Sequence, residues 1–144
     1  MIKPIITNKI ELAQPSYTVA LTEVMVPQTL TDLVDTAEHY RLKPIGCVGL
    51  AANQIGELFR VIVVWNGGNW IRMINPIWKA RDSKMGLSHE ACLSRPGVKR
   101  KIKRHKRILV NWWTEDGDVM EQKFSGFTAR IIQHECDHLD GVFI

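Results

Sequence analysis

The hydrophobic pattern of the first part of the chain predicts one amphipathic helix. Across residues 30–41, apolar side chains recur at the three- and four-residue spacing of a helix face. Thr29 or Thr31 can cap this helix, because a threonine hydroxyl accepts a hydrogen bond from a free backbone N–H of the first turn. Pro44 follows closely and prevents the helix from continuing.

The hydrophobic period then changes to that of strands. Residues 59–65 are short and β-branched, residues 66–69 (Asn-Gly-Gly-Asn) accept positive φ angles, and residues 70–74 are again apolar. This combination predicts a β-hairpin. Residues 107–113 and 119–124 flank an acidic turn containing glycine, and they predict a second hairpin.

The last segment returns to helical spacing and completes the expected fold. A helix is predicted over residues 126–140, with Ser125 as its N-cap and Gly141 as its C-terminal stop. Strands followed by such a helix predict an α+β fold, with small mixed or antiparallel sheets packed around the C-terminal helix. We expect residues 1–144 to form a single domain, because no linker or repeat divides them.

Composition and cysteine count predict the cellular compartment of the protein. The chain has 144 residues, of which 45% are hydrophobic and 24% charged, so it can bury a core without disulfides. No segment resembles a secretory signal, and no apolar run approaches the length of a membrane span. Three cysteines are an odd number, which favours a reducing compartment. We therefore expect a cytoplasmic monomer without membrane contact.

Two histidines on the last helix form the first candidate metal site. His134 and His138 are four residues apart, so both imidazoles project from one helix face, with Glu135 beside them as a base for activated water. The pattern alone also arises by chance. In one common peptidase site a third histidine lies six residues further on, but here that position is Ile144. A second peptidase group takes a glutamate from a later helix, and the sequence ends at Ile144, so we expect any third protein ligand to come from upstream.

A cysteine is the first upstream ligand to consider, because thiolates bind borderline and soft cations strongly. Cys136 lies about 200° around the helix from each histidine, so it faces the core. Cys92 is the preferred ligand, since residues 88–96 are expected to form a turn-like stretch between strands that can present it. The other candidates are Cys47, His89 and His105.

Three segments together resemble the peptide deformylase family. The motifs of that family are G-Φ-G-L-A-A-x-Q, E-G-C-L-S and Q-H-E-x-D-H-L, in that order. Here they read CVGLAANQ over residues 47–54, EACLS over residues 90–94 and QHECDHL over residues 133–139. The sequences INP at residues 74–76 and DGV at residues 140–142 extend the likeness.

The resemblance implies a hydrolase that removes the formyl group from the N-terminal formylmethionine of nascent polypeptides and releases formate. It also implies one divalent ion per chain, Fe²⁺ in the cell and Zn²⁺, Ni²⁺ or Co²⁺ in some isolated preparations. Mapped by motif, the ligands are Cys92, His134 and His138. Glu135 would accept a proton from water and later deliver one to the leaving amine. The Gln54 side chain and the backbone N–H of Leu93 would bind the oxyanion.

The methionine side chain of such a substrate needs an apolar slot. Val48 and Gly49 belong to the first motif, where Gly49 would let the backbone approach the substrate. Phe127 and Ile131 precede His134 by seven and three residues, so they share its helix face. Core packing explains these two residues as well as pocket lining does.

Two residues depart from the motifs. Cys47 replaces the first glycine of the first motif, and Ala91 replaces the glycine of the second. If the glycine of the second motif needs a positive φ, alanine in its place costs about 1 kcal/mol or more of conformational free energy. If the position needs only a small side chain, alanine costs almost nothing. We expect activity to survive, because the ligands and the glutamate are present. The chain resembles compact members of the family, without the further C-terminal helix of many bacterial relatives.

Other hypotheses compete with this one. One is a catalytically silent domain of the same fold that binds nascent chains or ribosomal RNA, which the intact ligand set disfavours. Another is a zinc peptidase, which the thiolate ligand and the missing downstream ligand disfavour. Residues 99–107, with the sequence KRKIKRHKR, could contact ribosomal RNA. The alternative is a solvated strand or loop, because the run offers no aromatic platform for base stacking.

Overall fold

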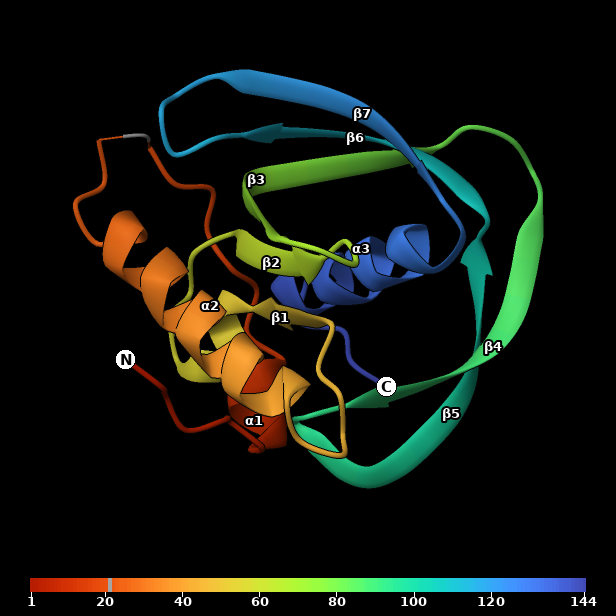
Figure 1. The fold of residues 1–144 in the computed structure, drawn as a ribbon, viewed down its shortest axis with the longest axis horizontal. Coiled ribbons are helices and arrows are strands. Elements are labelled where there is room, and N and C mark those ends of the chain that lie inside the picture. The colour runs from red at the N-terminus through yellow and green to blue at the C-terminus, as the bar shows by residue number, and fades with distance from the viewer. Residues whose placement is uncertain (21) are drawn as a thin grey trace.

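The computed structural model describes residues 1–20 and 22–144 (Figure 1). Its elements in chain order are α1 (Lys9–Leu12), α2 (Val26–Arg41), β1 (Gly49–Ala51), the 3₁₀ helix η1 (Ala52–Ile55), β2 (Val61–Trp65), β3 (Trp70–Ala80), β4 (Met85–Cys92), β5 (Arg95–His105), β6 (Arg107–Trp113), β7 (Val119–Ser125) and α3 (Gly126–Leu139). The strands form an antiparallel five-stranded sheet of order β1-β2-β3-β6-β7 and a separate antiparallel pair, β4 and β5. The expected α+β class is confirmed.

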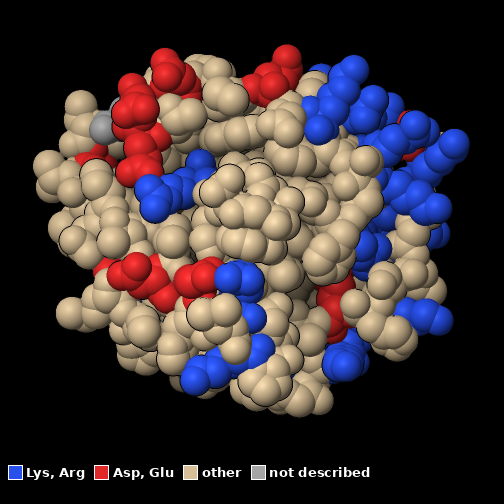
Figure 2. Space-filling model, viewed as in Figure 1, with Lys and Arg blue, Asp and Glu red and all other residues tan. Residues whose placement is uncertain are grey.

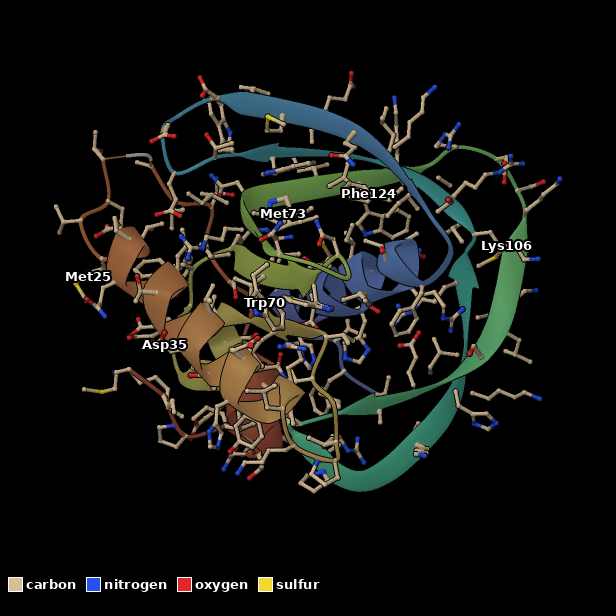
Figure 3. All side chains as sticks on the ribbon, in the orientation of Figure 1. Met25, Asp35, Trp70, Met73, Lys106 and Phe124 are labelled. Atoms are coloured by element: carbon tan, nitrogen blue, oxygen red, sulfur yellow. The ribbon has the colours of Figure 1, made fainter. Side chains whose placement is uncertain are left out.

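Strand β2 is buried on both faces, because a helix covers each side of the sheet there. Ile62 and Val64 pack with α3 in one core cluster, and Val61 and Val63 pack with α2 in another. Figure 3 shows Phe124 of β7 beside α3, where it belongs to the first cluster. This double burial explains why β2 reads as a continuous apolar run and lacks the alternation of a half-exposed strand.

Helix α2 starts earlier than the sequence predicts. It begins at Val26, and Pro27 fits its first turn because a proline lacks the N–H that would have no partner there. The prediction that a threonine caps this helix is wrong. Thr29 and Thr31 lie inside it and donate their hydroxyls to carbonyl oxygens one turn earlier, at 2.9 and 3.1 Å.

Helix α3 follows the prediction closely. Ser125 is its N-cap in backbone conformation, but its side chain makes no capping hydrogen bond. Gly141 ends the helix region with φ +76°, and a side chain there would also collide with the backbone of Ala13. Glycine is therefore required at this position on two grounds.

Both predicted hairpins are present, as β2–β3 and β6–β7, although β3 runs on to Ala80 and pairs with β6 in its second half. The prediction of a turn-like stretch over residues 88–96 holds only for residues 93–94, which form the turn between two strands. Strand β4 continues to Cys92, and β5 starts at Arg95. Most residues of both strands are exposed, and β5 is mostly basic, so neither strand shows the apolar alternation that identifies strands in a sequence. No helix of the described residues is long and apolar enough to cross a membrane.

Candidate metal and active site

Three ligand atoms meet where the end of β4 lies against α3. The Cys92 sulfur and one nitrogen each of His134 and His138 lie within 4.8 Å of one another. Cys92 Sγ is 3.2 Å from His138 Nε2, and both side chains are buried. Burial lowers the pKa of His138 to about 3, which keeps its imidazole neutral and able to bind an ion. One thiolate and two imidazoles form a donor set suited to a borderline divalent cation.

The other candidate ligands lie elsewhere. Cys136 packs in the core on the far side of α3, as predicted, and burial raises the pKa of its thiol to about 12. Cys47 donates to Gly49 O at 3.2 Å, and burial also raises its pKa to about 12. His89 is exposed on β4, and His105 lies beside Trp78. Among the described residues, no second group of three such side chains comes together.

A carboxylate behind the ligands orients one of them. Glu90 Oε1 accepts a hydrogen bond from His134 Nδ1 at 2.8 Å, which directs Nε2 of that ring toward the ligand cluster. Arg104 binds both oxygens of Glu90 at 2.9 and 3.0 Å. Burial alone would raise the pKa of Glu90, but the bonds from His134 and Arg104 outweigh it and lower the pKa to about 2. Glu90 is therefore a permanent anion.

The role of Glu90 is not among those predicted from the sequence. Its signal was present, because Glu90 and Cys92 are two residues apart and therefore share one face of a strand. The error over residues 88–96 hid this alternation.

The glutamate next to the ligands is buried and close to the first motif. Glu135 Oε2 has no hydrogen-bond partner within the described chain, and burial raises the pKa of the carboxyl to about 7, against the opposing effect of His134. A Cβ atom at Gly49 would lie 2.6 Å from Ile131 Cγ2 and 2.9 Å from Glu135 Oε1. Only glycine therefore lets β1 pass this close to the carboxyl group.

Gln54 points its amide nitrogen into the same site. Its Oε1 accepts a hydrogen bond from the backbone N–H of Ala51 at 3.0 Å, so the amide has one orientation. Its Nε2 donates to Ser94 Oγ at 3.1 Å and lies 3.4 Å from Cys92 Sγ. Leu93 stands between Cys92 and Ser94 in the turn that follows β4 and is half-buried. Both predicted oxyanion donors thus border the ligand cluster.

A cavity of about 230 Å³ opens onto these groups. The predicted site residues that line it are Val48, Gly49, Gln54, Cys92, Leu93, Phe127, Ile131, His134 and Glu135. His138 is buried and does not line it. Ile131 serves both as cavity wall and as core, whereas Phe127 is 67% exposed at the rim and is not part of the core.

The two residues that depart from the motifs also line this cavity. Among the described non-glycine residues only Asn75 has a positive φ, so neither Cys47 nor Ala91 is strained. Alanine at position 91 therefore costs almost no conformational free energy, as expected where the motif glycine is needed only for its small size.

An α+β fold in which a cysteine and two histidines converge next to a buried glutamate is the arrangement of a metal-dependent hydrolase. The family model for polypeptide deformylase matches residues 2–144. A peptide deformylase of Clostridium beijerinckii is 40% identical over 144 residues and covers all of both chains. One of Dictyoglomus turgidum is 41% identical over 119 residues, 83% of this chain and 74% of that protein.

Solved structures agree with the sequence matches. The crystal structure of peptide deformylase from Thermotoga maritima has a TM-score of 0.90 at 31% identity and covers 99% of this chain and 95% of that one. A deformylase from the Vibrio parahaemolyticus bacteriophage VP16T, in complex with actinonin, has a TM-score of 0.87 at 31% identity, with 98% and 99% covered. The chain belongs to the peptide deformylase family. It is an enzyme with the deformylase function, and the alternative of a silent binding domain is not supported.

Proposed function

We propose that this chain hydrolyses the N-formyl group of formylmethionyl peptides in the cavity above Cys92, His134 and His138, and that these three side chains hold one divalent ion. The observation that carries the proposal is the meeting of three ligand atoms within 4.8 Å beside the buried carboxyl group of Glu135. Fe²⁺ suits this set in the cell, since a thiolate donates more charge than a third imidazole. Zn²⁺, Ni²⁺ and Co²⁺ are alternatives for the isolated protein.

Glu135 carries the proton transfers. When bound, the ion supplies Lewis acidity that polarises the formyl oxygen and acidifies water. Glu135 accepts the proton of the attacking water and returns it to the amine nitrogen as the C–N bond breaks, which releases formate and a free N-terminus. A carboxyl group with a pKa near neutrality suits both steps.

Two donors stabilise the negative charge that develops on the formyl oxygen. Gln54 Nε2 is already turned toward the site by the bond between Ala51 N–H and its Oε1. The backbone N–H of Leu93 is the second donor. Each such donor contributes about 3 kcal/mol to transition-state stabilisation in comparable hydrolases.

The substrate peptide enters along the first motif. Val48 and Gly49 form one wall of the cavity, and Ile131 and the exposed Phe127 form another, which together give an apolar slot for a methionine side chain. A deformylase from Acinetobacter baumannii has been solved with Met-Ala-Ser bound and superposes with a TM-score of 0.90 at 29% identity, with 99% of this chain and 97% of that one covered. This supports a short methionyl peptide as the occupant here.

The test is release of formate from formyl-Met-Ala-Ser by anaerobically prepared protein whose metal content has been measured. We expect about one ion per chain and formate release that stops when a chelator removes the ion. Bound metal without formate release would contradict the proposal.

We further propose that the basic run contacts ribosomal RNA. Figure 2 shows Lys and Arg gathered on the side of the molecule where β4 and β5 lie. Residues 79–107 contain eleven Lys and Arg but two carboxylates, whereas the rest of the chain contains eight and thirteen. Lys99, Lys101 and Lys103 are exposed, and the residues across from them on β4 carry no negative charge. This local excess favours contact with phosphate.

Not every residue of the run is available for such contact. Arg104 is buried against Glu90 and Asp137, and Arg107 pairs with Asp82 at 2.6 Å. Replacing the three lysines by glutamine should weaken co-sedimentation with ribosomes and leave formate release from a short peptide unchanged. Undiminished co-sedimentation would contradict RNA contact.

None of the three cysteines forms a disulfide, which suits a reducing compartment. We infer that the chain acts in the cytoplasm, as a monomer.

A further inference from the structure

Apart from the chain itself and one backbone hydrogen bond at the far end of β5, from Gly126 N–H to Lys106 O at 3.1 Å, side chains hold the hairpin that carries Cys92 against the rest of the site. Strands β4 and β5 pair with each other and form no ladder with the five-stranded sheet. Cys92 is on this hairpin, whereas His134 and His138 are on α3. The distances between the three ligand atoms therefore depend on how the hairpin is held against the helix.

Arg130 joins the two. It lies one turn before His134 on α3, and its side chain is 15% exposed. Its Nη1 donates to Gly86 O at 2.9 Å, and its Nη2 lies within hydrogen-bond distance of Ile102 O at 2.7 Å, Glu90 Oε2 at 2.9 Å and Ser88 O at 3.3 Å. One guanidinium group thus binds the backbone of both strands and the carboxylate that orients His134.

The other links between hairpin and helix attach differently. Arg104 of β5 binds Asp137 and Glu90, and Gln133 of α3 exchanges two hydrogen bonds with the backbone of His105. These links, and the hydrogen bond from His134, reach β4 only through the side chain of Glu90, and the contact of His138 with β4 is made through the ligand sulfur of Cys92. Within the described chain, Arg130 is the one side chain of α3 that hydrogen-bonds to the backbone of β4.

We propose that Arg130 is a positioning residue that holds β4 on α3, so that Cys92 and Glu90 meet the two histidines in the geometry that an ion requires. This role rests on the proposed ligand set. The planar guanidinium group of arginine has five N–H donors and can bind backbone and carboxylate acceptors at once. A lysine ammonium group at the same place carries its donors on a single nitrogen atom. Arg130→Lys should therefore keep the ion pair with Glu90 and lose part of the backbone attachment.

The experiment uses cobalt-loaded protein. Sulfur ligation to Co²⁺ gives a charge-transfer absorption band, which reports the Cys92–metal bond without any turnover. We expect Arg130→Ala to shift or weaken this band and to lose cobalt to a chelator about tenfold faster or more. Arg130→Lys should release cobalt at an intermediate rate. Arg72→Ala is the matched control, because Arg72 pairs with Glu115 on the surface at 2.8 Å, and it should behave like the parent chain.

Hydrogen exchange of the metal-free protein complements the cobalt experiment. Amide hydrogen exchange in residues 85–92 should accelerate in Arg130→Ala relative to the control, while exchange in β2 should not change. An unchanged band and an unchanged cobalt release rate in Arg130→Ala would overturn the positioning role, even if its thermal stability fell. If Arg130→Ala does not fold, parent-like cobalt release and exchange in Arg130→Lys would overturn it instead. A parent chain without the sulfur band would refute the ligand set itself, and with it the role of Arg130.

Discussion

Glu90 Oε1 lies 2.8 Å from Nδ1 of His134, so a carboxylate of β4 orients an imidazole of α3. Glu90→Gln keeps the size of this side chain and removes its charge. We expect metal affinity to fall about 10- to 100-fold, because the imidazole loses both its orientation and the basicity that an anionic partner confers. Competition with a chromogenic chelator measures the change. Glu121→Gln, on the exposed side of β7, should leave affinity unchanged, and equal affinities in the two variants would contradict the role of Glu90.

The ligands on α3 could be predicted from sequence because helical spacing alone places His134 and His138 on one face. The upstream ligand was harder to assign. Elimination and motif order indicate Cys92, although the sequence predicts a turn where the structure has strands. The structure shows why this error did little harm: β4 ends at Cys92 with a shift of register after Ala91, so the ligand does sit at a bend.

Contacts of α3 with distant parts of the chain could not be predicted from sequence. Arg130 binds backbone carbonyl groups on two strands, and such acceptors have no sequence signature. The start of α2 was missed for a related reason. Val26 and Pro27 precede the first periodic apolar residues, and burial of Val26 depends on tertiary packing that a local pattern does not contain.

Glu135 should be needed for turnover and not for metal binding. Glu135→Gln keeps the side-chain volume, so the ligand cluster beside it should stay intact. Removing the proton acceptor should lower kcat by about 10²- to 10⁴-fold. Formate release at equal, measured metal occupancy tests this. Substantial remaining turnover would mean that another group accepts the proton.

Gly49→Ala should disturb the active site through crowding alone. The new methyl group would lie 2.6 Å from Ile131 Cγ2 and 2.9 Å from Glu135 Oε1, and both belong to a packed helix. Overpacking of this kind costs about 1–3 kcal/mol of unfolding free energy, and the displaced carboxyl group should also lower kcat. Gly68→Ala is the control, because its nearest neighbour would lie 3.9 Å away in the β2–β3 turn. Equal stability and kcat in both variants would contradict this close approach.

Two buried cysteines separate the ligand role from the packing role. Cys92→Ala removes the sulfur that lies 3.2 Å from His138 Nε2, and metal occupancy after dialysis should fall sharply. Cys136→Ala removes a thiol of the same size from the core on the opposite side of α3. It should lower the unfolding free energy by about 1 kcal/mol and leave the occupancy at about one ion per chain. Metal analysis together with denaturant unfolding distinguishes the two effects. If both variants retain the ion, Cys92 is not a ligand, and the site must be completed by a group other than this thiolate.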